Sequence, residues 1–240
     1  MATEARETRI HGSVLAAVEK RALIWMAERL PRWVNSDHLT GMGALALLAA
    51  GICYAFGRQQ PPALVLVIAL LAVNWFGDSL DGTLARVRHQ ERPRYGFYVD
   101  HVLDAIGILF LMAGLILGGY MSVIAGAGFL VAYYLLTIEI SLATHALGTF
   151  RLSYWKMGPT ELRIVLAIGT LMLLRSDSVV IAGQRLLLFD VGGAVAIGGL
   201  LVTFIAAAVS NSRRLYLQEP LPRPNNEKGI PNGTGALRCA

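Results

Sequence analysis

The chain has 240 residues, of which 55% are hydrophobic and 15% are charged, and its formal net charge is +5. Soluble domains carry roughly 25% charged residues, so this composition and the long apolar runs argue against a soluble enzyme and indicate an all-α integral membrane protein. The positive charge fits basic loops beside anionic lipid, and without a nucleic-acid-binding motif we expect no nucleic-acid partner. The two cysteines form no disulfide framework.

The first segment, residues 1–38, is mixed and basic and lacks the compact apolar core of a signal peptide. Between Val14 and Leu30, apolar residues recur at helical spacing among charged ones, which predicts an amphipathic helix. This helix either lies in the membrane interface, with Trp25 and Trp33 near the headgroups, or packs as an ordinary surface helix on the bundle. The sequence leaves both arrangements open.

Six apolar stretches then approach the length needed to cross a bilayer and predict a transmembrane domain over residues 39–210. The fifth stretch is the weakest, because Glu161, Arg163 and Arg175 limit its apolar centre. Residues 211–240 are rich in Pro and Asn, which predicts a flexible tail. The expected spans are 39–57, 62–81, 97–118, 121–147, 161–175 and 188–210.

The distribution of basic residues predicts how these spans are oriented. Of the 21 Lys and Arg residues, all but Arg58, Arg175 and Arg185 fall on one side of the membrane if six spans put both termini there. The positive-inside rule makes that side the cytoplasm, across the inner membrane if the source is a bacterium. The charged ends of the second and third spans then lie at the cytoplasmic face.

Four aspartates occupy those ends. Asp78 and Asp81 are three residues apart, and Asp100 and Asp104 are four apart, so each pair shares one helix face. At a bilayer centre each Asp would cost roughly 2.5–3.5 kcal/mol on insertion scales, and two facing pairs would repel each other. A hard cation such as Mg²⁺ or Mn²⁺, bound in a hydrated pocket, would compensate the negative charges of these aspartates. A cation transporter or channel that uses these acids is the alternative function.

The stretch around the aspartates resembles the signature of the CDP-alcohol phosphotransferase family, also called CDP-alcohol phosphatidyltransferases. That signature reads Asp, two residues, Asp-Gly, two residues, Ala-Arg, eight or nine residues, Gly, three residues, Asp, three residues, Asp. A match at every fixed position argues against four merely solvated acids. The matching residues are Asp78, Asp81, Gly82, Ala85, Arg86, Gly96, Asp100 and Asp104.

The resemblance implies a homodimeric, Mg²⁺- or Mn²⁺-dependent enzyme of phospholipid synthesis, in which an acceptor hydroxyl displaces CMP from a CDP-linked alcohol. It leaves open whether the donor is CDP-diacylglycerol or a CDP-amino-alcohol. By the resemblance all four aspartates bind metal, and Asp104 is also the general base. Gly96 is further expected to open the next helix, where free N–H groups favour an anion. The residues implied to line the CDP site are Gly82, Ala85, Arg86 and Gly96.

Four further polar residues are weaker candidates. Thr40 either touches the nucleotide or simply begins the first span, and His101 either acts in the site or hydrogen-bonds beside it. Glu139 is an ionisable group inside the fourth span and thus a functional candidate, unless it reaches to the interface. Glu161, with Arg163, either points into the cavity or belongs to an ordinary helix start led by proline.

Overall fold

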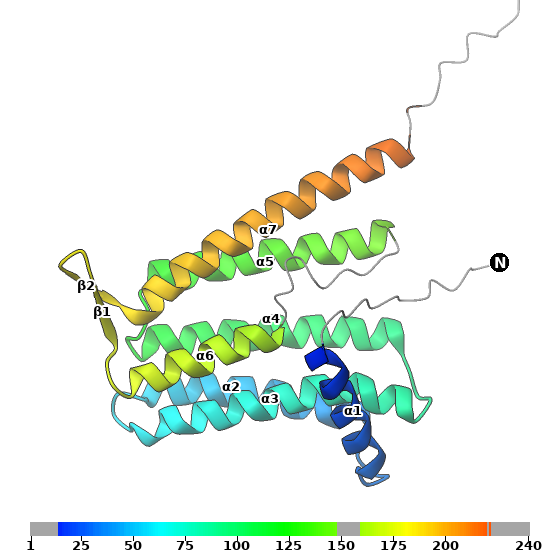
Figure 1. Cartoon of the computed structure of the whole chain (residues 1–240), viewed down its shortest axis with the longest axis horizontal. Helices are drawn as coiled ribbons and strands as arrows, with labels where there is room; N and C mark the ends of the chain where they lie inside the picture. The colour runs from blue at the N-terminus through cyan, green and yellow to red at the C-terminus, as the bar shows by residue number, and fades with distance from the viewer. Residues whose placement is uncertain (1–13, 148–158, 220, 222–240) are drawn as a thin grey trace, which may run out of the picture.

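The computed structural model describes residues 14–147, 159–219 and 221, and this part of the chain is mostly helical (Figure 1). Helices run back and forth along a common direction, and a β-hairpin lies at one end of the bundle. The elements in chain order are α1 (Val14–Arg29), α2 (Ser36–Phe56), α3 (Pro62–Val87), α4 (Pro93–Leu117), α5 (Val123–Leu147), α6 (Pro159–Leu173), β1 (Ser178–Ile181), β2 (Gln184–Leu187) and α7 (Leu188–Gln218).

Five helices, α2, α3, α4, α5 and α7, are long and apolar enough to cross a membrane. The fifth of the six expected spans is not confirmed, because the apolar part of α6 covers only Leu162–Leu173. This helix begins with a polar turn and ends before Arg175, so its apolar length is short. α7 continues to Gln218, past the expected end of its span at residue 210, so the first residues of the predicted flexible tail are helical.

Close helix packing holds the centre of the bundle together. α2 lies against both α3 and α4, and its Gly51 approaches Gly114 of α4 so closely that a Cβ on either glycine would strike the backbone of the other helix. A Cβ on Gly77 of α3 would likewise meet the backbone of α2. Small residues at such crossings let helix backbones approach. α2 therefore fixes the spacing of α3 and α4, the two helices that carry the aspartates.

The N-terminal helix α1 packs on α3. Leu23 and Ala27 of α1 are buried in one cluster with Leu80 and Leu84 of α3. Arg88, just after α3, donates hydrogen bonds to backbone carbonyl oxygens of the segment that follows α1. These contacts fit the surface helix packed on the bundle, and an amphipathic helix lying in the membrane interface is not confirmed.

At the end of the bundle with the β-hairpin, one arginine connects segments that are distant in the sequence. β1 and β2 pair antiparallel around a two-residue turn, Ala182 and Gly183, whose φ angles are 52° and 80°. Arg58 donates to the Gly118 carbonyl oxygen at 2.7 Å and forms an ion pair with Asp177 at 2.8 Å. The prediction of an all-α chain does not include this hairpin. β1 contains β-branched residues, which favour strands, and Gly183 readily adopts the positive φ angle that the turn requires.

Candidate functional site

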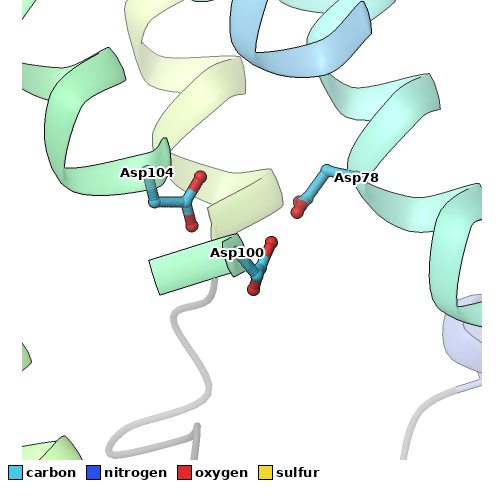
Figure 2. Close-up of side chains that lie close together, drawn as sticks. All are labelled: Asp78, Asp100 and Asp104. Carbon is cyan, nitrogen blue, oxygen red and sulfur yellow. The ribbon is translucent and has the colours of Figure 1, made fainter. Parts of the chain in front are cut away.

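Three carboxyl groups converge at the opposite end of the bundle. α3 and α4 are joined by a short loop and run antiparallel, and both pack against α2, so the C-terminal half of α3 faces the N-terminal half of α4. Carboxylate oxygens of Asp78, Asp100 and Asp104 all lie within 4.8 Å of one another. Figure 2 shows the three side chains turned toward a shared space. Asp78 of the first acidic pair therefore meets both acids of the second pair.

These acids line a small open pocket between α2, α3 and α4. α2 contributes Gly43 and Ala44, whose small side chains leave room beside the carboxylates. The pocket is thus acidic on the sides formed by α3 and α4, whereas α2 contributes small residues and the hydroxyl of Thr40. Its lining residues are Thr40, Gly43, Ala44, Asn74, Asp78, Asp81, Asp100, Leu103 and Asp104.

Both carboxylate oxygens of Asp81 have protein partners. Thr40 Oγ1 donates to Oδ2 at 2.6 Å, and the backbone N–H of Gly82 donates to Oδ1 at 2.5 Å. Ser36 Oγ also donates to the Asp81 carbonyl oxygen at 3.0 Å. The first turn of α2 thus holds Asp81 on the pocket wall. Its predicted role as a metal ligand stays a prediction.

An arginine from α6 reaches the cluster. Arg163 Nη2 donates to Asp78 Oδ2 at 2.8 Å, and Arg163 Nε donates to Asn74 Oδ1 at 2.6 Å. Asn74 Nδ2 in turn donates to the Gly43 carbonyl oxygen at 3.0 Å, so this network joins α2, α3 and α6. From the sequence, Arg163 is a candidate site residue only together with Glu161, and Asn74 is not among the candidates. A polar residue four positions before Asp78, on the same face of an apolar helix, is the signal that would have found it.

The other motif residues of α3 lie one turn further toward its C-terminal end. Gly82 faces the guanidinium of Arg86, whose Nη2 donates to Thr83 Oγ1 at 3.1 Å. Ala85 is partly exposed and Arg86 is exposed. These residues extend the acidic site toward the helix end, and their predicted contact with a nucleotide remains a prediction.

Gly96 does not open α4, so that expectation is wrong. The helix begins at Pro93, whose ring fixes the φ angle suited to a first helical position. The Gly96 N–H already donates to the Arg92 carbonyl oxygen at 2.8 Å and is therefore not free for an anion. Gly96 is exposed, and a Cβ built on it would meet nothing within 4 Å. Its predicted place at the CDP site is left as a prediction.

The weaker candidates fall in different places. Thr40 lines the pocket, as described above, whereas His101 lies beside it, with Nδ1 3.0 Å from the Phe97 carbonyl oxygen and 3.9 Å from Asp100 Oδ2. Glu139 is buried on α5, where its Oε1 accepts from Asn211 Nδ2 of α7 at 2.7 Å. Glu161 lies in α6, but its side chain is outside the described residues.

The chemistry of this donor set fits a divalent cation. Asp78, Asp100 and Asp104 supply only carboxylate oxygens, which hard ions such as Mg²⁺ and Mn²⁺ prefer. Like charges this close repel each other, and within the part of the chain that the structure describes one ion pair, from Arg163 to Asp78, offsets this repulsion. A bound cation would compensate the rest. The geometry therefore supports these three residues as candidate metal ligands.

Comparisons with known proteins agree with this arrangement. Residues 33–209 match the sequence profile of the family described as CDP-alcohol phosphatidyltransferase. The chain is also 32% identical over 121 residues to the archaetidylinositol phosphate synthase of Methanothermobacter thermautotrophicus, which covers 48% of this chain and 58% of that protein. The chain thus spans little more than half the length of this relative. The family match covers α2, α3, α4 and α6, the helices that build the acidic pocket and its arginine.

Proposed function

Since the chain belongs to the CDP-alcohol phosphatidyltransferase family, we propose that it is a metal-dependent enzyme of phospholipid synthesis that releases CMP from a CDP-linked alcohol. The observation that carries this proposal is the convergence of Asp78, Asp100 and Asp104 in one pocket. A group of carboxylates without matching cations has an electrostatic cost that is repaid when a cation and an anionic substrate bind. The diphosphate of a CDP-linked alcohol is such a substrate.

In this reaction the acceptor hydroxyl attacks the phosphorus atom distal to cytidine. A new P–O bond forms to the acceptor, the P–O bond to CMP breaks, and CMP leaves with the electron pair. Asp78, Asp81, Asp100 and Asp104 would together hold Mg²⁺ or Mn²⁺, which supplies positive charge to the diphosphate when bound. Asp104 lies one turn deeper along α4 than Asp100 and would accept the proton of the hydroxyl.

The rest of the motif would bind the nucleotide. Arg86, near the end of α3, offers a planar guanidinium suited to phosphate, and Gly82 and Ala85 leave room beside it. Gly96, exposed in the first turns of α4, would approach the same ligand from the other helix. The lipid substrate would reach the pocket from the bilayer around the five long apolar helices. Two copies of the chain would form the working homodimer.

The position of the acids favours an enzyme over a transporter. All four aspartates lie in the C-terminal half of α3 or the N-terminal half of α4, which places them in the same half of the bundle. A transport path would need polar groups along the membrane normal, whereas chemistry on a water-soluble head group needs them at one surface. The acidic cluster therefore fits catalysis at the membrane surface.

A direct assay for CMP release tests this proposal. The purified protein is incubated with Mg²⁺, with CDP-diacylglycerol, CDP-choline or CDP-ethanolamine, and with candidate hydroxyl acceptors. We expect CMP release from one donor, its loss in excess chelator, and its return when Mg²⁺ or Mn²⁺ is restored. The Asp100→Asn variant is the matched negative control. Full CMP release in a strong chelator would contradict the metal-dependent reaction.

We further propose that all six predicted spans cross the membrane and that the pocket faces the cytoplasm, because this arrangement puts all but three of the Lys and Arg residues on that side. Single cysteines are introduced at Gln59, Gln90 or Asn226 in a chain whose Cys53 and Cys239 have been replaced by serine. A membrane-impermeant thiol reagent applied to intact cells should label Gln59→Cys, in the loop between α2 and α3, and spare the other two. Labelling at all three positions would contradict this orientation.

A further inference from the structure

Arg163 has an unusual place at the acidic pocket. In the described part of the chain, it makes the one ion pair between an arginine or lysine and the four motif aspartates. Its side chain is 11% exposed, and that of its partner Asp78 is 24% exposed, so the pair is largely shielded from water. Asn74 holds the Nε edge of the guanidinium. This arginine is therefore fixed at the pocket from a different helix, α6.

The Asp78 carboxylate is a candidate partner for two cations, the Arg163 guanidinium and a divalent metal ion. Asp78 Oδ2 accepts from Arg163 Nη2 at 2.8 Å, while Asp78 also belongs to the group of three carboxylates that fits a divalent ion. A guanidinium and a divalent ion that share one carboxylate lie a few ångströms apart and repel each other strongly at the effective dielectric of a partly buried site. Binding of one cation at Asp78 must therefore weaken binding of the other.

We propose that Arg163 is a resident counter-ion that competes with the divalent cation for Asp78 and keeps metal affinity low until the anionic substrate binds. Without metal, the guanidinium offsets part of the repulsion among the aspartates and stabilises the open pocket. When a diphosphate arrives, its negative charge relieves the repulsion between Arg163 and the metal. Metal and nucleotide then raise each other's affinity, because such coupling is reciprocal. This inference rests on the proposed metal-dependent function.

A purely structural role for Arg163 predicts something different. If the network with Asn74 only fastens α6 to α3, removal of the guanidinium should loosen the pocket and weaken metal binding. If Arg163 competes with the metal, its removal should tighten metal binding while the protein without metal becomes less stable. The sign of the change in metal affinity therefore separates the two roles.

The experiment measures Mn²⁺ binding to the full chain in detergent by electron paramagnetic resonance, with and without CDP. For Arg163→Gln we expect at least about tenfold tighter Mn²⁺ binding than in the unmodified protein without nucleotide, because one repelling unit charge is removed. Addition of CDP should then tighten Mn²⁺ binding less than it does in the unmodified protein. Arg163→Lys keeps the charge and should stay close to the unmodified protein. Arg175→Gln, an exposed change just past the other end of α6, is the matched control and should leave Mn²⁺ affinity unchanged.

Thermal unfolding of the same proteins provides a second readout. In chelator, Arg163→Gln should unfold at a lower temperature than the unmodified protein, and Mn²⁺ should raise its unfolding temperature by a larger increment. If Arg163→Gln folds poorly, Asn74→Ala removes the anchor of the guanidinium together with the hydrogen bond to the Gly43 carbonyl oxygen, and it should tighten Mn²⁺ binding by a smaller factor. Equal or weaker Mn²⁺ binding by both variants would overturn the inference alone. Failure of every protein, including the unmodified one, to bind Mn²⁺ would overturn the proposed metal role as well.

Discussion

The two ends of the helix bundle carry polar clusters that differ in how their charges are matched. At the end with the β-hairpin, Arg58 faces one carboxylate, Asp177, and donates to the carbonyl oxygens of Gly118 and Gly119. At the other end, four aspartates line one pocket, and among the described residues one arginine, Arg163, forms an ion pair with one of them. Both clusters tie helices together, but only the first is close to charge balance.

This difference separates a structural cluster from a functional one. A matched pair with satisfied hydrogen bonds requires nothing more, and when it is exposed it contributes little beyond local order. An excess of like charges in a confined pocket is unfavourable by itself and persists only where a ligand supplies the missing charge. The comparison therefore predicts large functional effects of changes at the aspartate end and small stability effects at the hairpin end.

The largest effects are expected from the aspartates themselves. Asp104→Asn should keep binding of the CDP group but lose roughly 10²–10⁴-fold in turnover, because it removes the proposed base. Asp78→Asn should also lose turnover and, in addition, weaken metal-dependent nucleotide binding. CDP binding and CMP release are measured on the same purified variants. If Asp104→Asn abolishes binding as fully as Asp78→Asn does, Asp104 is chiefly a metal ligand.

A smaller effect is expected at Thr40, which connects α2 to the site. Thr40→Val keeps the shape of the side chain but removes the donor to Asp81 Oδ2. Hydrogen bonds to charged groups contribute roughly 1.5–3 kcal/mol, so we expect about a 10- to 100-fold fall in kcat/KM. Thr203→Val on α7, whose hydroxyl donates to the Gly199 carbonyl oxygen, is the matched control. Equal changes in the two variants would show that Thr40 has no special role.

The sequence predicts the spans and the acidic motif well, because both depend on local patterns. Long apolar runs predict where the helices begin to within about four residues, but they end α3 and α7 several residues too early, and the span through α6 is not confirmed. The i, i+3 and i, i+4 spacings place the aspartates on shared faces. The meeting of Asp78 with Asp100 and Asp104 also follows, since α3 and α4 are joined by a short loop. The distance between the two helices, however, is set by α2, which packs against both of them.

The contacts between distant segments could not be predicted in this way. Arg163 lies 85 positions after Asp78, and Thr40 lies 41 positions before Asp81, so their pairing depends on how α6 and α2 pack against α3. The burial of α1 through Leu23 has the same origin, because its charged and apolar residues suit either a bundle or a membrane surface. The local sequence pattern is compatible with either arrangement, and tertiary packing determines which one forms.

The smallest effect is expected at the hairpin end. Arg58→Met removes an ion pair whose side chains are 50% and 39% exposed, so we expect a loss of about 1 kcal/mol or less in the free energy of unfolding from the pair itself. CMP release per folded molecule should stay within about twofold, a change worth less than 1 kcal/mol. Thermal unfolding and the CMP assay are run on the same preparation. A large loss of turnover with unchanged stability would contradict the assignment of this cluster to structure.

The central claim is that the unbalanced acids hold a divalent cation. Crystals of the full chain grown with Mn²⁺ and CDP, with diffraction data collected near the manganese absorption edge, test it most directly. We expect an anomalous peak among the carboxylates of Asp78, Asp100 and Asp104, and none between Arg58 and Asp177. Ordered CDP without an anomalous peak at the three aspartates would contradict it.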